Sequence, residues 1–555
     1  MKQIRINKQF LVLIICLVSI LAIEGKGQAA PQDLNLTLRG EKAIERLEQD
    51  GSYNSLIRAV KTDRRKNEPS QEESLTAQET KLFTPDSGDQ NFGISVAISG
   101  NTAIVGETSA TIGGNLGQGA AYIYILSGGI WTLQQKITAF DGVTANGNFG
   151  ISVAISGDTA VVGRGSIDPP TGAAQNGVVY VFIRTGTVWT LQQELFPSDN
   201  HTTQNRFGRS VALENDTLVV GSPDALVTLP QGIKRGAAYI YTRINTPSGV
   251  IWTDEQKIFT PDFPAIRGFG NAVAISANTV VVGELPGSDP NVGAAYFFTR
   301  NGTTWTRQQE VTASDGTNGD GFGWSVAING DTAIIGALRL NDPNQSLINL
   351  GSAYVLTRSG TTWTEQQKLI PSDGAANKGF GRSVSMSGNA AIIGAFADTL
   401  GRGSAYIFTG TGTTWTQQQK LIPSDGTTNG QFGTSVGISG NTAIVGAPNN
   451  TTDPTFQIRP GEAYIFTGLS LGNVTVSGRV TTPDGRGLRN ASVSITDSNN
   501  VRRTATTSSF GFFSFEDVAV GGTYVIRVSS RLYRYTPQTV MVNDNLTLPD
   551  FVGLE

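Results

Sequence analysis

The stretch NFGISVAISGNTAIVG at residues 91–106 returns at residues 148–163 as NFGISVAISGDTAVVG, with two letters changed. Its opening Phe-Gly pair occurs seven times at intervals of 52 to 62 residues, a spacing typical of solenoids, propellers and arrays. The sequence therefore predicts an array of seven similar units. Their first residues are Phe92, Phe149, Phe207, Phe269, Phe322, Phe380 and Phe432.

Each unit contains four short segments that are rich in β-branched and aromatic residues and are separated by turn residues. In the sixth unit these segments are 380–386, 390–395, 403–410 and 415–422. Two-residue pairs such as Gly100-Asn101 and Gly330-Asp331 stand between the first two segments and suit tight hairpins. Four antiparallel strands in succession make a propeller blade, so we predict an all-β chain with a seven-bladed β-propeller.

The ends of the array distinguish a closed ring from a solenoid, which would leave two open ends. The seventh unit stops after its third segment, at Gly468. An unattached segment at 78–88, QETKLFTPDSG, precedes the first unit and is similar to the fourth segment QQKLIPSDG at 418–426. A ring closed by its own N-terminal strand explains both observations and leaves no exposed sheet edge. We therefore expect residues 81–84 to pair antiparallel with residues 463–467.

Across residues 79–468 the pattern resembles the FG-GAP repeat of the integrin α-subunit propeller and its bacterial relatives. Residues Gly446-Ala447-Pro448 match the Gly-Ala-Pro part of the FG-GAP pattern. The resemblance implies calcium between the first two strands, but a two-residue turn cannot wrap a cation that takes about six to eight oxygens. We therefore expect no metal and no cofactor. The loop SDGTNGDG at 314–321 is a weaker calcium candidate, which a solvated polar turn explains better; its oxygen-bearing residues are Asp315, Asn318 and Asp320.

Three residue types recur at fixed places in the units. An Asp precedes each Phe-Gly pair, and it would form either a ring of carboxylates at the mouth or, as we expect, turns bonded to nearby backbone N–H groups. A Tyr in each third segment and a Trp at the start of six fourth segments would be sugar platforms or, as we expect, packing between blades. The positions are Asp86, Asp141, Asp199, Asp262, Asp315, Asp373 and Asp425; Tyr122, Tyr180, Tyr239, Tyr296, Tyr354, Tyr406 and Tyr464; and Trp131, Trp189, Trp252, Trp305, Trp363 and Trp415.

Candidate binding residues come from departures from the repeat. Segments that join the second strand to the third, and one unit to the next, share one face of a propeller and vary widely here, and function tends to lie on such loops. In the third unit, 222–235 carries Lys234 and Arg235 and shares that face with His201, the chain's one histidine. Trp324 stands two positions after Phe322, where the other units have no aromatic residue. These four are possible ligand-binding residues, and no catalytic residue is expected.

The two ends of the chain differ from the array. Residues 1–29 have a basic start, an apolar run and a small-residue cleavage site, typical of a secretory signal peptide, with a retained anchor as the alternative. Residues 30–78 suggest a short helical segment, docked or tethered, and a charged linker. Residues 469–555 alternate with period two. Their stretches SGRVTTPDGRGLRNASVSI and TSSFGFFSFEDVAVG resemble the carboxypeptidase regulatory-like domain, a transthyretin-like β-sandwich without catalytic residues of its own.

Composition narrows the function classes. The net charge of -4 gives no reason to expect nucleic acid, and the single cysteine, Cys16, lies in the apolar N-terminal run. We expect a secreted or cell-surface protein, with no stable membrane span after signal cleavage, that binds an extracellular protein or glycan and is not an enzyme. The sameness of the units favours this view, because catalysis needs asymmetry. A carboxylate-based polysaccharide hydrolase or lyase and a purely structural spacer stay open as alternatives.

Overall fold

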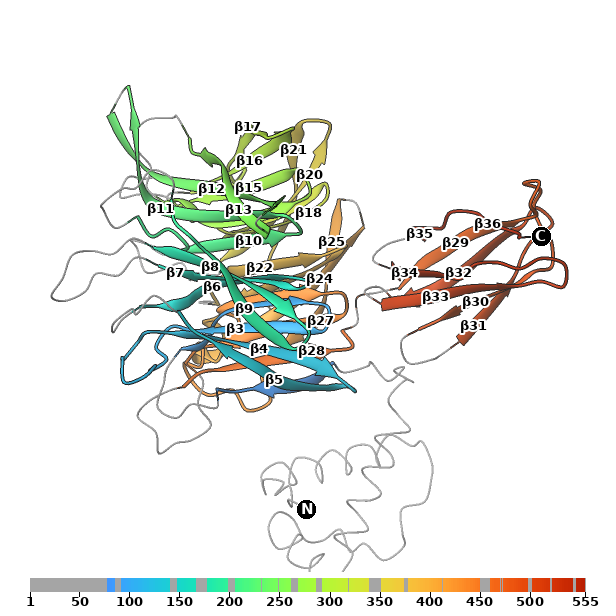
Figure 1. Cartoon of the computed structure of the whole chain (residues 1–555), viewed down its shortest axis with the longest axis horizontal. Coiled ribbons are helices and arrows are strands. Elements are labelled where there is room, and N and C mark those ends of the chain that lie inside the picture. The colour runs from blue at the N-terminus through green and yellow to red at the C-terminus, as the bar shows by residue number, and fades with distance from the viewer. Residues whose placement is uncertain are drawn as a thin grey trace, which may run out of the picture. The chain divides into compact units, whose positions relative to one another are not determined.

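A computed structural model of the chain shows an all-β protein built from a propeller and a sandwich (Figure 1). No helix in the described part of the chain is long and apolar enough to cross a membrane. The predicted segments at 1–29 and 30–76 lie outside the described residues. Those are 77–554 without the gaps at 85–90, 140–146, 166–176, 198–204, 231, 248, 261–267, 286–291, 318, 339–350, 374–377, 412, 450–459, 470, 472, 498–501, 520–521 and 543–545.

Seven four-stranded antiparallel blades form the propeller, as the repeat predicts. The first strands are β2 (Phe92–Ser99), β6 (Phe149–Ser156), β10 (Ser210–Glu214), β14 (Phe269–Ser276), β18 (Phe322–Asn329), β22 (Phe380–Ser387) and β26 (Ser435–Ser439). The second strands are β3 (Thr102–Glu107), β7 (Thr159–Arg164), β11 (Thr217–Leu229), β15 (Thr279–Glu284), β19 (Thr332–Ala337), β23 (Ala390–Ala395) and β27 (Thr442–Ala447).

The outer half of each blade is equally regular. The third strands are β4 (Ala120–Ser127), β8 (Val178–Thr185), β12 (Gly232–Thr246), β16 (Ala294–Asn301), β20 (Ser352–Ser359), β24 (Ser404–Thr411) and β28 (Glu462–Thr467). The fourth strands are β5 (Ile130–Ile137), β9 (Val188–Leu195), β13 (Gly249–Ile258), β17 (Thr304–Val311), β21 (Thr362–Leu369), β25 (Thr414–Leu421) and, in the seventh blade, β1 (Gln78–Leu82). One four-residue helix, α4 (Asp398–Gly401), lies between β23 and β24.

The N-terminal strand closes the ring. Strand β1 pairs antiparallel with β28, from Gln78 opposite Thr467 to Leu82 opposite Ala463. The pairing was predicted, but the strand begins three residues earlier than expected and ends before residues 83–84. The Ser435 hydroxyl of the last blade donates to the carbonyl of Gly93 in the first blade at 2.8 Å. The two ends of the array are therefore joined at both the inner and the outer strands.

Removing the closing strand should leave β28 as an open edge. We expect a chain without residues 77–84 to aggregate on refolding, because unpaired strand edges are templates for pairing between molecules. Size-exclusion chromatography of the shortened and full chains, refolded side by side, measures this. A shortened chain that stays monomeric and melts like the full chain would contradict closure by β1.

The Phe-Gly pair forms the turn that starts each blade. In the first blade, Asn91 and Gly93 have φ angles of 69° and 89°, and the N–H of Ile94 donates to the Asn91 carbonyl at 3.1 Å. A positive φ at the third position of such a turn needs glycine. The buried Phe92 ring meets Tyr122 edge-on at 5.4 Å, and the equivalent Phe–Tyr pair recurs in all seven blades. The turn thus fixes a repeated aromatic core.

Residues 473–552 form a separate β-sandwich, which is described here by itself. One sheet contains β29 (Asn473–Thr481), β32 (Phe512–Ala519), β35 (Leu546–Thr547) and β36 (Phe551–Val552). The other contains β30 (Ser492–Thr496), β31 (Arg502–Thr506), β33 (Gly522–Ser529) and β34 (Gln538–Val542). Buried side chains from both sheets, including Val476, Val493, Phe513 and Ile526, make one core. The predicted sandwich is present.

Candidate functional site

The two faces of the propeller differ. Short turns such as Gly100-Asn101 join the first strand to the second on one face, and their Gly φ angles are positive, for example 54° at Gly100. We call this the uniform face. Segments that join the second strand to the third, and each blade to the next, open on the other face, which we call the variable face. Sequence variation is concentrated there, as predicted.

A long β-hairpin is the largest departure on the variable face. Strands β11 and β12 contain 13 and 15 residues, whereas the six other second strands each have six and the six other third strands have six or eight. The hairpin extends beyond the blades at the upper left of Figure 1. Its pairing shifts between Ser222 and Leu226 and continues to Leu229 opposite Gly232. Residues 222–235, expected to be a variable loop, are therefore mostly strand, and that expectation was wrong in form.

The base of this β11–β12 hairpin is firmly held. Ala225 and Val227 are buried in the core of the third blade. The Ser222 hydroxyl donates to the Asn205 carbonyl at 2.7 Å. Asp224 pairs with Arg206 at 2.7 Å. Because the anchors include apolar burial as well as polar contacts, the projection is preorganised by the blade.

The residue that directly follows each Phe-Gly pair lies where the inner strands of the ring meet. First strands of neighbouring blades contact one another all round the ring. Asn271 of the fourth blade donates through its amide to the Trp324 carbonyl of the fifth at 3.2 Å. Arg382 of the sixth blade lies over the Trp324 ring at 5.0 Å and near the Phe396 ring at 5.6 Å. These residues stand at the variable-face end of the central channel, because each follows directly from a turn on that face.

The recurring Asp residues connect one blade to the next. In the fifth blade, Tyr354 donates to Asp315 at 2.7 Å, and the Lys368 ammonium group pairs with the same carboxylate at 2.6 Å. Asp315 follows the last strand of the fourth blade, whereas Tyr354 and Lys368 belong to the fifth. Asp425 repeats the arrangement with Tyr464 at 2.7 Å and Lys81 at 2.8 Å. Both carboxylates also accept a hydrogen bond from a local backbone N–H, as expected, and the bond to the next blade comes in addition. Asp86, Asp141, Asp199 and Asp262 lie outside the described residues.

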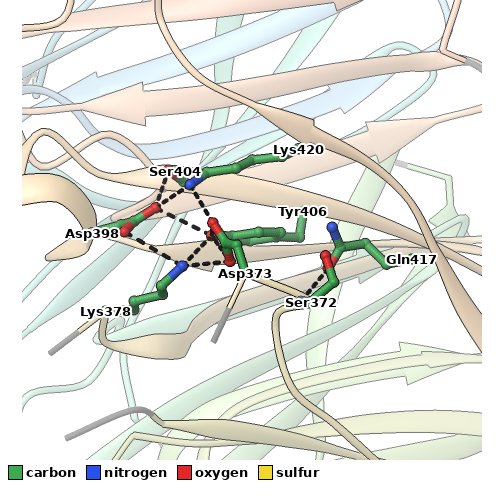
Figure 2. A network of polar contacts seen from close by, with 8 residues as sticks. All are labelled: Ser372, Asp373, Lys378, Asp398, Ser404, Tyr406, Gln417 and Lys420. Atoms are coloured by element: carbon green, nitrogen blue, oxygen red, sulfur yellow. Dashed lines mark hydrogen bonds and ion pairs between the residues drawn. The ribbon is translucent and has the colours of Figure 1, made fainter. Parts of the chain in front are cut away.

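The sixth blade expands this arrangement into a buried ionic network, shown in Figure 2. Asp373 pairs with Lys420 at 2.7 Å and with Lys378 at 2.5 Å. Asp398, carried by α4, pairs with Lys420 at 2.6 Å and Lys378 at 3.6 Å. The side chains of Lys378 and Asp398 are only 1% and 5% exposed. The Tyr406 hydroxyl lies among these charges and donates to Asp398 at 3.2 Å. Two cations thus balance two carboxylates, with Lys378 and Asp398 buried and with Lys420 and Asp373 partly open to solvent.

Both carboxylates of this network are held in the ionised form. Burial opposes ionisation of Asp373, but the ammonium groups of Lys378 and Lys420 outweigh it and hold its pKa below the usual range. Burial also opposes ionisation of Asp398, and contacts with Lys420 and Ser404 outweigh it, so its pKa is lowered. A general acid needs a raised carboxyl pKa. The network therefore joins loops to strands and lacks the acid–base pair of a glycosidase.

A small cavity lies beside the network. It has a volume of about 360 Å³ and is lined by Arg402, Gly403, Lys420, Ile422, Pro423 and Gly426. Lys420 is already engaged by two carboxylates, which leaves the exposed Arg402 as the lining charge that faces solvent. The cavity alone supplies too few polar groups to define a ligand.

Within the described residues, no three His, Cys, Asp or Glu side chains lie close enough together to hold a metal ion. In the loop at 314–321, Asp320 accepts from the Thr317 N–H at 2.6 Å, and Asp315 binds Tyr354 and Lys368. Asn318 lies outside the described residues. The loop therefore does not converge its oxygens on one point.

We expect calcium to leave the propeller's stability unchanged. The physical reason is the two-residue turn at the place where integrin-type repeats hold the ion, because such a turn offers too few oxygens. Thermal melts in calcium and in chelator should coincide within about one degree. Stabilisation by several degrees would show that calcium binds the folded chain, since ligand binding raises the melting temperature.

The structure places the predicted binding residues in different parts of the propeller. His201 lies outside the described residues. Lys234 and Arg235 are in β12, opposite Val227 and Leu226, at the part of the hairpin that projects from the variable face. Trp324 is half-buried at the channel mouth. The structure therefore places Trp324 apart from the hairpin pair and groups it with Arg382 and Asn271, which sequence analysis did not select.

The repeated Trp and Tyr rings are packing residues, as expected. All seven Tyr and the six Trp at the starts of fourth strands are buried. Gln135 and Trp189 exchange two hydrogen bonds of 2.8 Å between their side-chain amide and backbone, which link neighbouring outer strands. The same two hydrogen bonds join Gln193 to Trp252, Gln256 to Trp305, Gln309 to Trp363 and Gln367 to Trp415. Buried rings cannot act as sugar platforms.

Comparison with known proteins agrees with this geometry. No curated protein matches the chain. The carboxypeptidase regulatory-like domain model matches residues 475–552. The FG-GAP repeat model matches 76–124, 131–182, 189–241, 252–298, 305–356, 363–408 and 415–466, more than half of the chain. Each match begins with an outer strand and ends with the third strand of the next blade, which is why the first repeat supplies β1. The chain belongs to the FG-GAP repeat family of β-propeller proteins.

Proposed function

We propose that this propeller is a non-catalytic extracellular binding protein and that its variable face carries the binding surface. The observation that supports the proposal most is the β11–β12 hairpin, which projects from that face on a base buried in the core. A rigid scaffold that displays variable segments is a common arrangement for recognition. An anchored projection also loses little conformational freedom on binding, which favours affinity.

The charges in the blades support binding over catalysis. The described Asp residues that recur between blades are paired with Lys and Tyr, and the pKa values of Asp373 and Asp398 are lowered. Asp373 and Asp398 are therefore ionised in their ion pairs, where they stabilise the ring and are not proton donors for glycoside cleavage. The signal-like residues 1–29 favour an extracellular setting. The partner is an extracellular protein or glycan.

A binding screen with one hairpin variant and one control variant tests this proposal. The chain from residue 30 onward is applied to immobilised extracellular-matrix proteins and to a glycan array. Each hit is measured again with residues 228–235 replaced by a Gly-Ser turn, which keeps the buried Ala225 and Val227 and the Asp224–Arg206 pair. We expect binding to fall at least tenfold. The control variant carries Asn101→Lys and Asn441→Lys, both on the uniform face, and should bind normally. Loss of binding in the control alone would contradict the choice of face.

A further inference from the structure

Arg209 and Arg382 lie on opposite sides of the ring, at the same end of the central channel. Arg209 belongs to the third blade and Arg382 to the sixth, and each directly follows the Phe-Gly pair that starts its blade. Blades three and six face each other across a seven-membered ring whose centre is lined by the first strands. Burial lowers the pKa of Arg382 to about 10, and the charge of Arg209 adds to the effect.

Within the part of the chain that the structure describes, no ion pair joins Arg209 or Arg382 to a carboxylate. Burial also lowers the pKa of Arg209, and the nearby charge of Arg206 lowers it further. Two like charges in a poorly solvated channel destabilise the folded state. An arrangement that costs stability and brings cations together is typical of a site for an anion.

Arg382 is held in place while its hydrogen-bonding edge stays available. The guanidinium lies over the Trp324 ring at 5.0 Å and near the Phe396 ring at 5.6 Å. Rings bind the flat face of a guanidinium, whereas its N–H groups point outward in the plane. Trp324 is itself linked to Asn271 through its carbonyl. Aromatic packing therefore orients Arg382 without neutralising it.

We propose that Arg209 and Arg382 bind a carboxylate that a partner protein inserts into the channel mouth. The planar guanidinium fork matches a carboxylate in two-point hydrogen bonds. The site is encircled by the seven first strands, so it admits a protruding group from the end; a polysaccharide lying across the face would need an open groove. The carboxylate is that of an acidic side chain or of a chain terminus. This inference deepens the proposed function and rests on it for the variable face as the binding surface. The choice of a protein over a glycan rests on the enclosed shape of the channel mouth.

Three short peptides test the site on the full chain from residue 30. Acetyl-Gly-Glu-Gly-amide presents a side-chain carboxylate, acetyl-Gly-Gln-Gly presents a terminal one, and acetyl-Gly-Gln-Gly-amide presents neither. Titration calorimetry at low salt should detect binding of one or both carboxylate peptides and none of the neutral peptide. Whichever binds more tightly identifies the source. Equal binding of all three would overturn the proposal, as would tighter binding of hexagalacturonate or inorganic sulfate.

Variants separate binding from a structural role. Arg209→Met should weaken peptide binding at least tenfold and leave the melting temperature of the free protein unchanged or raised, because it removes a repelling charge. Arg382→Lys should also weaken binding, since lysine lacks the planar fork. Arg402→Met, which removes an exposed positive charge that does not belong to a first strand, should bind normally. A lowered melting temperature with unchanged affinity in Arg209→Met would show a structural role and overturn the proposal.

The same titrations distinguish this inference from the proposed function. The variant with residues 228–235 replaced should still bind the carboxylate peptides, because it keeps the Phe-Gly turns and the Asp224–Arg206 pair beside Arg209. If that variant loses the screened partner while the full chain ignores all peptides, the variable face binds but the channel site is wrong. If the peptides bind and the hairpin variant keeps its partner, the channel site holds and the hairpin does not carry recognition.

Discussion

Gly93→Ala is expected to lower the free energy of unfolding by about 4 kcal/mol or more, the range reached when overpacking and backbone strain combine. Gly93 has a φ of 89°, and a Cβ there would lie 2.4 Å from the carbonyl oxygen of Glu462 in the last blade. That oxygen belongs to backbone in a paired strand and cannot move aside cheaply. Because the contact joins the first and seventh blades, the substitution acts on ring closure. Denaturant unfolding measures the change.

Gly100→Ala is the matched control. Gly100 also has a positive φ, 54°, but no heavy atom lies within 4 Å of its Cβ position. The cost should therefore be about 1 to 2 kcal/mol, the strain of a left-handed alanine alone. Equal losses in the two variants would show that the glycine contact between the first and last blades is not tightly packed.

Asp398→Asn should destabilise the chain by about 3 kcal/mol, the size typical when one partner of a buried ion pair is removed. Asp398 is almost fully buried and contacts both Lys378 and Lys420. With its charge removed, two ammonium groups would share the single carboxylate of Asp373. Asp315→Asn is the control, because Asp315 makes the equivalent contact to Lys368 with its side chain 51% exposed. Its loss should stay below about 1 kcal/mol.

The wild-type chain and Asp398→Asn should differ in how their stability responds to acid. The folded-state pKa of Asp398 is lowered, so its contribution is complete above the ordinary Asp pKa of about 4 and is lost as the pH falls toward the folded value. The wild-type free energy of unfolding should therefore fall more steeply below about pH 4 than that of Asp398→Asn. Denaturant titrations between about pH 3 and 7 give both slopes. Parallel slopes would show that Asp398 is not ionised in the folded network.

Much of the fold follows from the repeat. The Phe-Gly spacing, the two-residue turns and the unattached segment before the first unit together predict seven blades and a ring closed by β1. They do so because each unit repeats one local arrangement, in which turn chemistry and alternation fix four strands. The buried roles of Tyr and Trp follow for the same reason, since a residue present in every unit has to serve every unit.

The candidate sites could be predicted only in part, because they depend on contacts between distant units. Trp324 stands out by comparison with the other blades, but the nearness of Arg209 and Arg382 arises only when seven blades close into a ring. The network around Asp398 likewise needs α4 to fold back over β24. A signal was present, because Lys378 stands two residues before Phe380, where no other unit has a lysine. Residues 222–235 were predicted to be a loop. The sequence shows that the connection between the second and third strands is long here, but it does not show that the two strands continue to pair along it.

Hydrogen–deuterium exchange of the chain with and without a saturating screened partner tests the claim that the variable face binds. Exchange slows where a partner covers or orders backbone amides, so the protected segments locate the interface. The account predicts slower exchange in residues 222–235 and in the Phe-Gly turns at 206–209 and 379–382, with no change at the uniform turns 100–101, 157–158 and 330–331. Protection confined to those uniform turns would contradict it.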